Sequence, residues 1–531
     1  MRTIIITLIS IILYQILLAQ KTEVYYGVSG RMDVVEDIIE IYDKGYYILG
    51  GFDGGNGYYN GWNIKTDINL EMLYDKVLEH DLSTVAQFAS VSDENGNIYI
   101  TGFTTYMEQW PFVTKLDSCG NKVWCKILDH SSEFNYGWAL DIIITNNNEI
   151  VLLGYFDSDE EIALIHLVGL SQEGHVNWIK PYASRNDHSW IREPSGLSII
   201  QINDEYYISG DCYWPYPDDT THFFQRPLFI GIDSLFNEKW ILPFYPLDSI
   251  FGKAYKSIPL NDSVFMGVGI RRFYNNEDFS LLMFYNKDGE ELGYNEILND
   301  QIGPDINSNE IRNITKINDS LFITGSVFGP DFSENPVGEM VIDTAANIYN
   351  LQSHPNTVSF IPGLIKTYDN NYVIATSIEE TKGDKDIYVY KIDENLNDVP
   401  FDPTPHTYDS LCPGGIQSGT IDLTSCFVWT NIRDAPSPKE YYESIRKIPV
   451  KAYPNPATQG TITFEYKNTE HHRNIELRCF DIYGEEIHKE KVYRYQGESV
   501  VDIGSWRKGM YVAVVYSNGL PVGQCKFVHL R

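Results

Sequence analysis

Short apolar strands recur along most of the chain, each preceded by a polar turn and ending at glycine or another small residue. The clearest copy is residues 149–154, Glu-Ile-Val-Leu-Leu-Gly, after a run of three asparagines. Six further copies share this pattern: residues 45–50, 97–102, 205–210, 263–267, 320–325 and 371–375. Polar turns beside runs of β-branched and aromatic residues predict the second strand of a hairpin. The seven copies lie 50 to 58 residues apart, so the chain contains a long repeat.

A second apolar strand follows each copy and leads through a turn to a strand that often carries tryptophan. The clearest examples lead to Trp124, Trp178 and Trp240. With one more strand before each hairpin, such as residues 139–144, every unit has four strands and no helix. Four-stranded units repeated about every fifty residues are typical of β-propeller blades. We therefore predict an all-β fold with seven blades between about residues 33 and 401, and tryptophans packed between the blades.

The loops that vary between repeats are the candidate binding surface, because propellers change their face loops on a rigid scaffold. Loops between second and third strands emerge on the same face as the connections between blades. The aromatic residues predicted on that face are Trp110, Trp138, Trp190, Tyr213, Trp214 and Tyr216. Flat rings mixed with carboxylates and arginines suit a glycan or an extended peptide. The alternative is that these rings close the ends of the propeller's own core.

Sequence motifs of common enzymes are absent: there is no Gly-x-Ser-x-Gly elbow, no His-Glu-x-x-His and no Gly-x-x-x-x-Gly-Lys-Ser/Thr. Non-enzymatic binding or adhesion is therefore the leading hypothesis. A polysaccharide hydrolase with two carboxylates from different blades, for instance Glu133 and Glu193, is the rival, and a purely structural surface component is the third reading. No cofactor or metal site is predicted. Calcium at the acidic loop 157–161 is a weaker alternative, because that loop lacks the ligand spacing and glycine of known calcium loops.

The end of the chain follows a different pattern. Prolines on both sides of one asparagine predict a rigid turn before the alternating strand 461–466. A second strand follows at 475–480 and ends in an Asp-x-x-Gly turn, and the last strand ends near residue 531. The marker residues are Tyr453, Pro454, Asn455, Pro456, Asp481, Gly484, Gly509, Tyr511, Lys526 and Phe527.

This order closely resembles the type A C-terminal sorting domain of the type IX secretion system of Bacteroidetes. The resemblance covers residues 450–531 and departs from the family at Cys479 and Cys525, where aliphatic residues are usual. It implies an immunoglobulin-like β-sandwich that is recognised by the outer-membrane machinery. It also implies removal by a sorting peptidase as the protein is attached to surface lipopolysaccharide or released. The preceding repeats resemble the propellers that often precede such domains in secreted and surface proteins.

The N-terminus agrees with export through the periplasm. A positive Arg2, an apolar run at residues 4–18 and a small Ala19 predict a signal peptide, with the mature chain starting at Gln20. An uncleaved anchor is the alternative, although the run is shorter than the ~20 residues a span needs. No later stretch is predicted to cross a membrane. We divide the chain into a signal peptide (1–19), a seven-bladed propeller (20–401), a linker (402–448) and a sorting domain (449–531).

The amino-acid composition limits the kinds of molecule that the chain is expected to bind and the disulfides that it can form. The chain has 73 acidic and 40 basic residues, a net charge of -33, which argues against nucleic acid. Seven cysteines in an oxidising compartment permit three disulfides. Cys412 and Cys426 flank a Pro-Gly-Gly segment and are the preferred pair. The further pairings considered are Cys119 with Cys125, and Cys479 with Cys525.

Overall fold

The computed structural model describes most of residues 22–530, in two compact units, Met1–Ala435 and Pro436–Arg531. The gaps are 56, 82, 106–108, 129–135, 157–163, 185–187, 189, 217–218, 245–250, 273–276, 330–335, 382, 413, 430–434, 446–448, 467–474, 493–496 and 518–519. The predicted signal peptide therefore lies outside the described residues. Each unit is all-β apart from one short helix, α2 (Asn299–Ile302) in the first and α3 (Pro438–Ile445) in the second, among the residues described.

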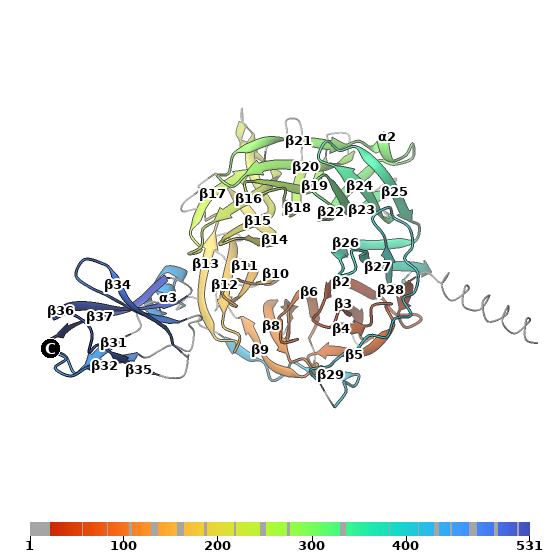
Figure 1. Ribbon diagram of the computed structural model, residues 1–531. Helices are drawn as coiled ribbons and strands as arrows, with labels where there is room; N and C mark the ends of the chain where they lie inside the picture. The colour runs from red at the N-terminus through yellow and green to blue at the C-terminus, as the bar shows by residue number, and fades with distance from the viewer. Residues whose placement is uncertain are drawn as a thin grey trace, which may run out of the picture. The chain divides into compact units, whose positions relative to one another are not determined.

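The first unit is a ring of seven four-stranded antiparallel blades, as the repeat predicted (Figure 1). Blade 1 contains β2 (Asp33–Glu40), β3 (Tyr46–Asp53), β4 (Tyr59–Thr66) and β5 (Met72–Glu79). Blade 2 contains β6 (Val85–Ser92), β7 (Ile98–Thr104), β8 (Trp110–Leu116) and β9 (Lys122–Leu128). Blade 3 contains β10 (Gly137–Ile144), β11 (Ile150–Phe156), β12 (Leu164–Leu170) and β13 (Val176–Tyr182). Blade 4 contains β14 (Arg192–Ile202), β15 (Glu205–Tyr216), β16 (Asp219–Ile232) and β17 (Glu238–Pro243). Blade 5 contains β18 (Phe251–Pro259), β19 (Val264–Arg272), β20 (Asp278–Asn286) and β21 (Glu291–Ile297). Blade 6 is β22 (Ser308–Lys316), β23 (Leu321–Gly329), β24 (Val337–Asp343) and β25 (Ile348–His354).

Blade 7 is built from both ends of the propeller. Strands β26 (Thr357–Lys366), β27 (Tyr372–Thr381) and β28 (Asp384–Ile392) come from its end, and β1 (Glu23–Tyr26) from its beginning. β1 pairs antiparallel with β28, with Tyr25 opposite Tyr388. The N-terminal strand therefore closes the ring.

The hairpin turns and the tryptophans have structural roles. The carboxylate of Asp117 accepts hydrogen bonds from the backbone N–H groups of Cys119 and Asn121, a local bond pattern that favours a tight turn. Trp124 donates its indole N–H to the carbonyl of Gln172 in the next blade, and Trp240 donates to that of Lys287. Trp178 packs on Phe236, also of the next blade, with ring centroids 4.3 Å apart. The predicted packing of these tryptophans between blades is confirmed.

The segment that follows blade 7 is not a free linker, because residues up to 435 belong to the same compact unit as the propeller. β29 (Gly419–Asp422) adds parallel to the outer edge of blade 1 through β5. β30 (Phe427–Trp429) adds parallel to the outer edge of blade 2 through β9. We call residues 402–412 and 414–429 the strap.

The disulfide predictions were wrong. Cys412 bonds to Cys119, and Cys426 bonds to Cys125, across 293 and 301 residues of chain. The strap runs along blades 1 and 2, so each of its cysteines meets a cysteine of blade 2 instead of its neighbour in sequence. Cys479 and Cys525 are free, since strand β36 lies between their strands.

The second unit contains a two-sheet sandwich of the immunoglobulin-like kind. One sheet holds β31 (Val450–Tyr453), β32 (Thr461–Tyr466) and β35 (Glu498–Asp502), and the other holds β34 (Glu486–Lys491), β33 (Glu476–Phe480), β36 (Gly509–Ser517) and β37 (Leu520–His529). The strands alternate buried and exposed residues, as in β32, where Ile462, Phe464 and Tyr466 are buried. The rings of Phe464 and Tyr466 pack with Phe527 in one core.

Candidate functional site

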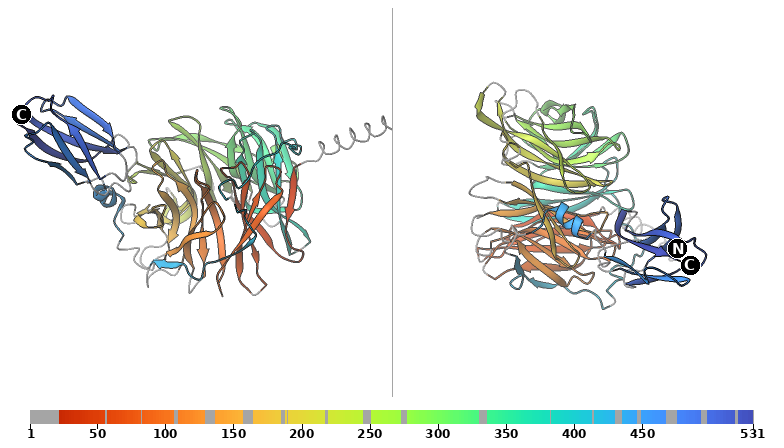
Figure 2. Two further views of the ribbon diagram at one scale, coloured as in Figure 1. Left: turned by 60° about the horizontal axis from the view of Figure 1, so that its bottom comes forward. Right: turned by 90° about the vertical axis from the view of Figure 1, so that its left-hand side faces the viewer.

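The candidate site lies on blade 4 and on the innermost strands of the ring. Blade 4 has the longest hairpin of the propeller: β15 and β16 have 12 and 14 residues, against 7 each for the corresponding strands of blade 3. The hairpin, yellow-green in Figure 2, extends beyond the neighbouring strands. Its far half is therefore held by fewer neighbours than the strands of an ordinary blade.

An aromatic pair forms where the hairpin meets the connection from blade 3. Trp190 of that connection and Trp214 of β15 meet edge to face, with ring centroids 3.9 Å apart and planes inclined by 65°. Both side chains are partly buried, so each keeps some surface toward solvent. Edge-to-face packing of this kind fixes the orientation of both rings.

Two charged residues follow Trp190 at the start of β14. The guanidinium of Arg192 lies 3.7 Å from the ring centroid of Phe223, and Arg192 is exposed. The next residue, Glu193, is also exposed and has a φ of +46°, a conformation that a residue with a Cβ rarely adopts. It lies in a bulge between Arg192 and Ser195. We call Trp190, Arg192, Tyr213, Trp214 and Phe223 the blade-4 cluster, which includes Tyr213 because it lies directly opposite Arg192 across β14 and β15.

Among the described residues, the contacts of Trp110 and Trp138 lie elsewhere. Trp138 stacks on Tyr155 of its own blade, with centroids 4.6 Å apart and planes 3° from parallel. Trp110 packs against the core between blades 1 and 2. The side chain of Tyr216 and all of Glu133 lie outside the described residues. Of the six predicted rings, the structure brings together Trp190 and Trp214, and it places Tyr213 beside Trp214 in the chain.

A group of polar residues on the innermost strands of the ring was not predicted. We call these residues the belt: Glu36, Asp37, Ser90, Asp141, Lys256 and Asn313. The innermost strand of each of blades 1 to 6 has a register shift at the same position, which leaves Glu36, Phe88, Leu140, Leu197, Tyr255 and Arg312 unpaired in the ladder. Such bulges re-aim the side chains next to them. Figure 1 shows these strands innermost in the ring.

Bonds from the belt join consecutive blades. The carboxylate of Asp37 accepts hydrogen bonds from the backbone N–H and the hydroxyl of Ser90, at 2.8 and 3.0 Å. Asp141 accepts from the backbone N–H of Ile199 at 2.8 Å, and Lys256 donates to Asn313 at 2.8 Å. These contacts link blade 1 to 2, blade 3 to 4 and blade 5 to 6.

Burial shifts the protonation of the belt. It raises the pKa of Glu36 to about 8 and that of Asp37 to about 7, and the charge of Asp37 adds to the rise at Glu36. Burial also lowers the pKa of Lys256, although Asp141 and Asp37 oppose this. Near neutral pH, Glu36 therefore holds its proton. Among the residues described, no group of three or more His, Cys, Asp or Glu side chains is arranged to hold a metal ion.

A denser ionic network joins blades 4 to 6 near the loop ends of their strands. Arg312 pairs with Glu310 at 2.8 Å, and Tyr255 donates its hydroxyl to Glu310 at 3.0 Å. Ion pairs among the described residues of this network also join Lys253 to Asp211, Arg271 to Glu296 and Arg272 to Asp278. The sequence signal that could have found this network is the spacing of Glu310 and Arg312, two residues apart in one predicted strand.

In the sorting domain, most marker residues hold the fold together. Asn455 donates to the carbonyl of Lys526 at 2.9 Å and accepts from the N–H of Val528 at 3.0 Å, so it fastens the Pro-Asn-Pro turn to the last strand. Phe527 is fully buried and stacks on Tyr511 with centroids 5.5 Å apart. Asp481 accepts the N–H groups of its own turn, where Gly484 has a φ of +83°. Gly509 begins β36, and the two prolines flank Asn455. Tyr453 and Lys526 are exposed.

A propeller that is followed in the chain by a separate sandwich defines a two-domain, all-β protein. Residues 451–528 match the family described as the secretion system C-terminal sorting domain. The chain therefore carries a type IX sorting domain, which interacts with the type IX machinery and directs the protein to the outer-membrane surface or the medium. A search of curated proteins found no match. In the described part of the chain, no helix is long and apolar enough to cross a membrane.

Solved structures give distant similarities. Drosophila Semaphorin 2a has a TM-score of 0.43 at 8% identity, over 96% of this chain and 97% of that one. An ulvan lyase from a new family of polysaccharide lyases has 0.44 at 10% identity, over 70% and 96%. A protein of unknown function from Bacteroides caccae has 0.32 at 10% identity, over 59% and 94%. At these scores the similarities carry no argument about ligand or activity.

Proposed function

We propose that this exported protein recognises an extracellular glycan or protein through the blade-4 cluster of its propeller. The observation that carries the proposal is the contact between Trp190 and Trp214, both of which keep some surface toward solvent. Rings fixed in orientation contribute contact area at low entropic cost, and the guanidinium of the exposed Arg192 supplies directional donors. The strained Glu193 supports the same assignment, because backbone strain clusters at binding sites.

The experiment is a glycan and protein array probed with the full mature chain, followed by titration of each hit against variants. Trp214→Ala should weaken the binding of a true ligand, whereas Tyr349→Ala should leave its binding unchanged. Tyr349 is a matched control, since it is an exposed aromatic residue, at 63%, on β25 of blade 6. Equal affinity of both variants for every hit would reject the blade-4 cluster as the site.

The second candidate function is hydrolysis of a polysaccharide. What favours it is that Glu36, with a pKa of about 8, is protonated at neutral pH, as a general acid must be. Incubation of the chain with the polysaccharides that bind, followed by a reducing-end assay, tests this candidate. Activity in the unmodified chain and its loss in Glu36→Gln, with binding retained, would support hydrolysis over recognition alone.

We further propose that a sorting peptidase removes the sorting domain after export and that the propeller is then attached to surface lipopolysaccharide or released. Tyr453 and Lys526 support recognition by another protein, because they are exposed while Phe527 and Tyr511 fill the core. Mass spectrometry of the surface-attached and released forms would locate the cut. A chain that keeps residues 450–531 in both forms would reject removal.

A further inference from the structure

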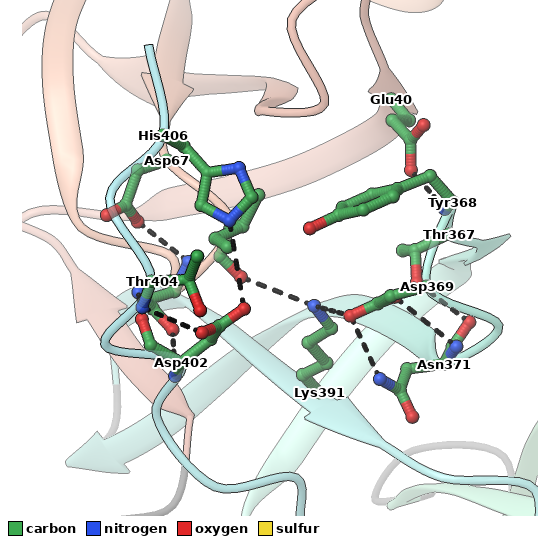
Figure 3. Close-up of polar contacts among 12 residues, drawn as sticks. Glu40, Asp67, Thr367, Tyr368, Asp369, Asn371, Lys391, Asp402, Thr404 and His406 are labelled. Atoms are coloured by element: carbon green, nitrogen blue, oxygen red, sulfur yellow. Dashed lines mark hydrogen bonds and ion pairs between the residues drawn. The ribbon is translucent and has the colours of Figure 1, made fainter. Parts of the chain in front are cut away.

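The seam of the ring, where blade 7 meets blade 1, is held by polar contacts between the two blades. Tyr368 donates its backbone N–H to Glu40 at 2.7 Å, and Val35 donates its N–H to the hydroxyl of Ser377 at 3.1 Å. Lys391 of blade 7, only 3% exposed, pairs with Asp369 at 2.8 Å and reaches the carbonyl of Ile68 in blade 1 at 3.4 Å (Figure 3). The contribution of β1 to closure is a strand of four residues.

The strap begins at this seam. Asp402 and Asn69 of blade 1 exchange two hydrogen bonds: the N–H of Asp402 donates to the Asn69 side chain at 2.7 Å, and that side chain donates back at 2.9 Å. In Figure 3, Asp402 lies with Thr404 and His406 on the blade 1 side of Lys391. Strap contacts therefore start directly beside the bonds that close the ring.

The strap then fastens to the turns of blade 1. The hydroxyl of Tyr408 accepts the backbone N–H of Ile68 at 3.1 Å. Asp409 donates its N–H at 3.0 Å to Asp43, whose other oxygen is 2.6 Å from the fully buried ammonium of Lys65. A buried ion pair holds its geometry tightly, because separating the charges leaves each one desolvated. Asp43 is therefore a fixed attachment point for the strap.

Covalent bonds complete the path beyond blade 1. The Cys119–Cys412 bond joins the end of the propeller to the turn between β8 and β9, and the Cys125–Cys426 bond joins it to β9. Each bond closes a loop that contains blades 3 to 6 and the strands β26, β27 and β28 of blade 7. If the seam opened, blade 7 would still be linked covalently to blade 2 through the strap and its two disulfides. A closed loop of this length strongly restricts the opened chain.

We propose that the strap and its two disulfides form a covalent lock that keeps the propeller ring closed independently of the N-terminal strand β1. In the oxidised protein, β1 can detach while the chain from β9 of blade 2 to β28 of blade 7 stays in a covalent ring with the strap. In the reduced protein, closure rests on β1, on the polar contacts of the seam and on the apolar core that blades 7 and 1 share. The lock thus makes ring closure sensitive to thiol reductants.

The test combines removal of β1 with reduction. The full mature chain is compared with a variant lacking residues 20–26, each with and without dithiothreitol. The reagent donates two electrons and two protons to each disulfide, giving two protein thiols and its own cyclic disulfide. Hydrogen exchange is followed in β2 and β26 at the seam, and in β15 of blade 4 as the remote reference. If the truncated chain fails to fold, Tyr25→Ala replaces it, because this change removes the stacking on Tyr388 at 4.7 Å and keeps the backbone of β1.

In the oxidised state, loss of β1 should change seam exchange less than about threefold, since the covalent ring persists. In the reduced state, the same loss should speed seam exchange by about a hundredfold and β15 exchange far less, because opening is local. A chain with Cys119, Cys125, Cys412 and Cys426 all changed to Ala should behave as reduced without reagent and should not respond to it. Equal seam exchange in the oxidised and reduced truncated chains would overturn the lock.

Discussion

Trp190 lies in the connection from blade 3 to blade 4 and Trp214 lies in β15, and their rings meet 3.9 Å apart between centroids. Changing Trp214 to Ala removes a ring that the proposed ligand would cover, so we expect binding to weaken by about 2 kcal/mol or more. Titration calorimetry with the best array hit measures this. Because Trp214 is partly buried, the melting temperature is recorded in parallel, and a large loss of stability with unchanged affinity would assign the ring to packing alone.

The buried Lys65–Asp43 pair should stabilise the propeller much more than the neighbouring exposed pair. Both side chains of the first pair are at most 2% exposed, whereas Lys44, which pairs with Glu40 at 3.5 Å, is 49% exposed. Lys65→Met leaves a buried carboxylate without its cation and should cost about 3 to 5 kcal/mol. Lys44→Met is the matched control and should cost less than about 1 kcal/mol. Denaturant unfolding compares the two, and similar midpoints would contradict the assigned role of Asp43.

The number of blades could be predicted from the sequence because each blade contains a short local pattern that identifies it. An apolar strand after a polar turn, as at residues 149–154, is recognisable without any distant partner, and its repetition fixes the number of units. The sorting domain was predictable for a similar reason, since residues such as Asn455 and Phe527 occupy fixed places in a short segment. Patterns that repeat or cluster along the chain are therefore the ones that sequence reasoning reads well.

Features that depend on the path of the chain in space could not be predicted. Cys412 appeared to pair with Cys426 because the two are near in sequence, but the strap carries each to a different cysteine of blade 2. The sequence predicts Trp138 and Trp214 on the same face of the propeller and does not distinguish their contacts. In the structure, Trp138 stacks within its own blade, whereas Trp214 contacts Trp190. The burial of Glu36 likewise follows from the bulge and the closed ring, and neither is visible in one strand.

Export should depend on the sorting domain while folding of the propeller should not. The sandwich and the propeller are separate compact units with separate cores. A chain ending at residue 435 should therefore accumulate in the periplasm with its two disulfides formed. Cell fractionation and thiol labelling measure both properties. Surface display of the shortened chain at the normal level would contradict the role of residues 451–528.

The mature chain should begin at Gln20, because a signal peptidase cuts after a small residue such as Ala19. N-terminal sequencing of the exported protein checks this directly. A start within a few residues of Gln20 leaves β1 intact for blade 7, since β1 begins at Glu23. An N-terminus beyond Tyr26 would show that the exported propeller closes without β1.

The protonation of Glu36 should make the propeller lose stability as pH rises. Its pKa is raised from 4.5 to about 8 by burial, so between these values the folded chain holds a proton that the unfolded chain has released. The contribution is therefore fully present below about pH 4.5 and is lost as pH rises through about 8, because stability falls with pH wherever the folded state binds more protons. Melting temperatures from pH 5 to 9 measure the slope. Glu36→Gln should flatten it, whereas Glu94→Gln, at an exposed turn, should leave it unchanged. Parallel curves for both variants and the unmodified chain would mean that Glu36 is ionised in the folded ring.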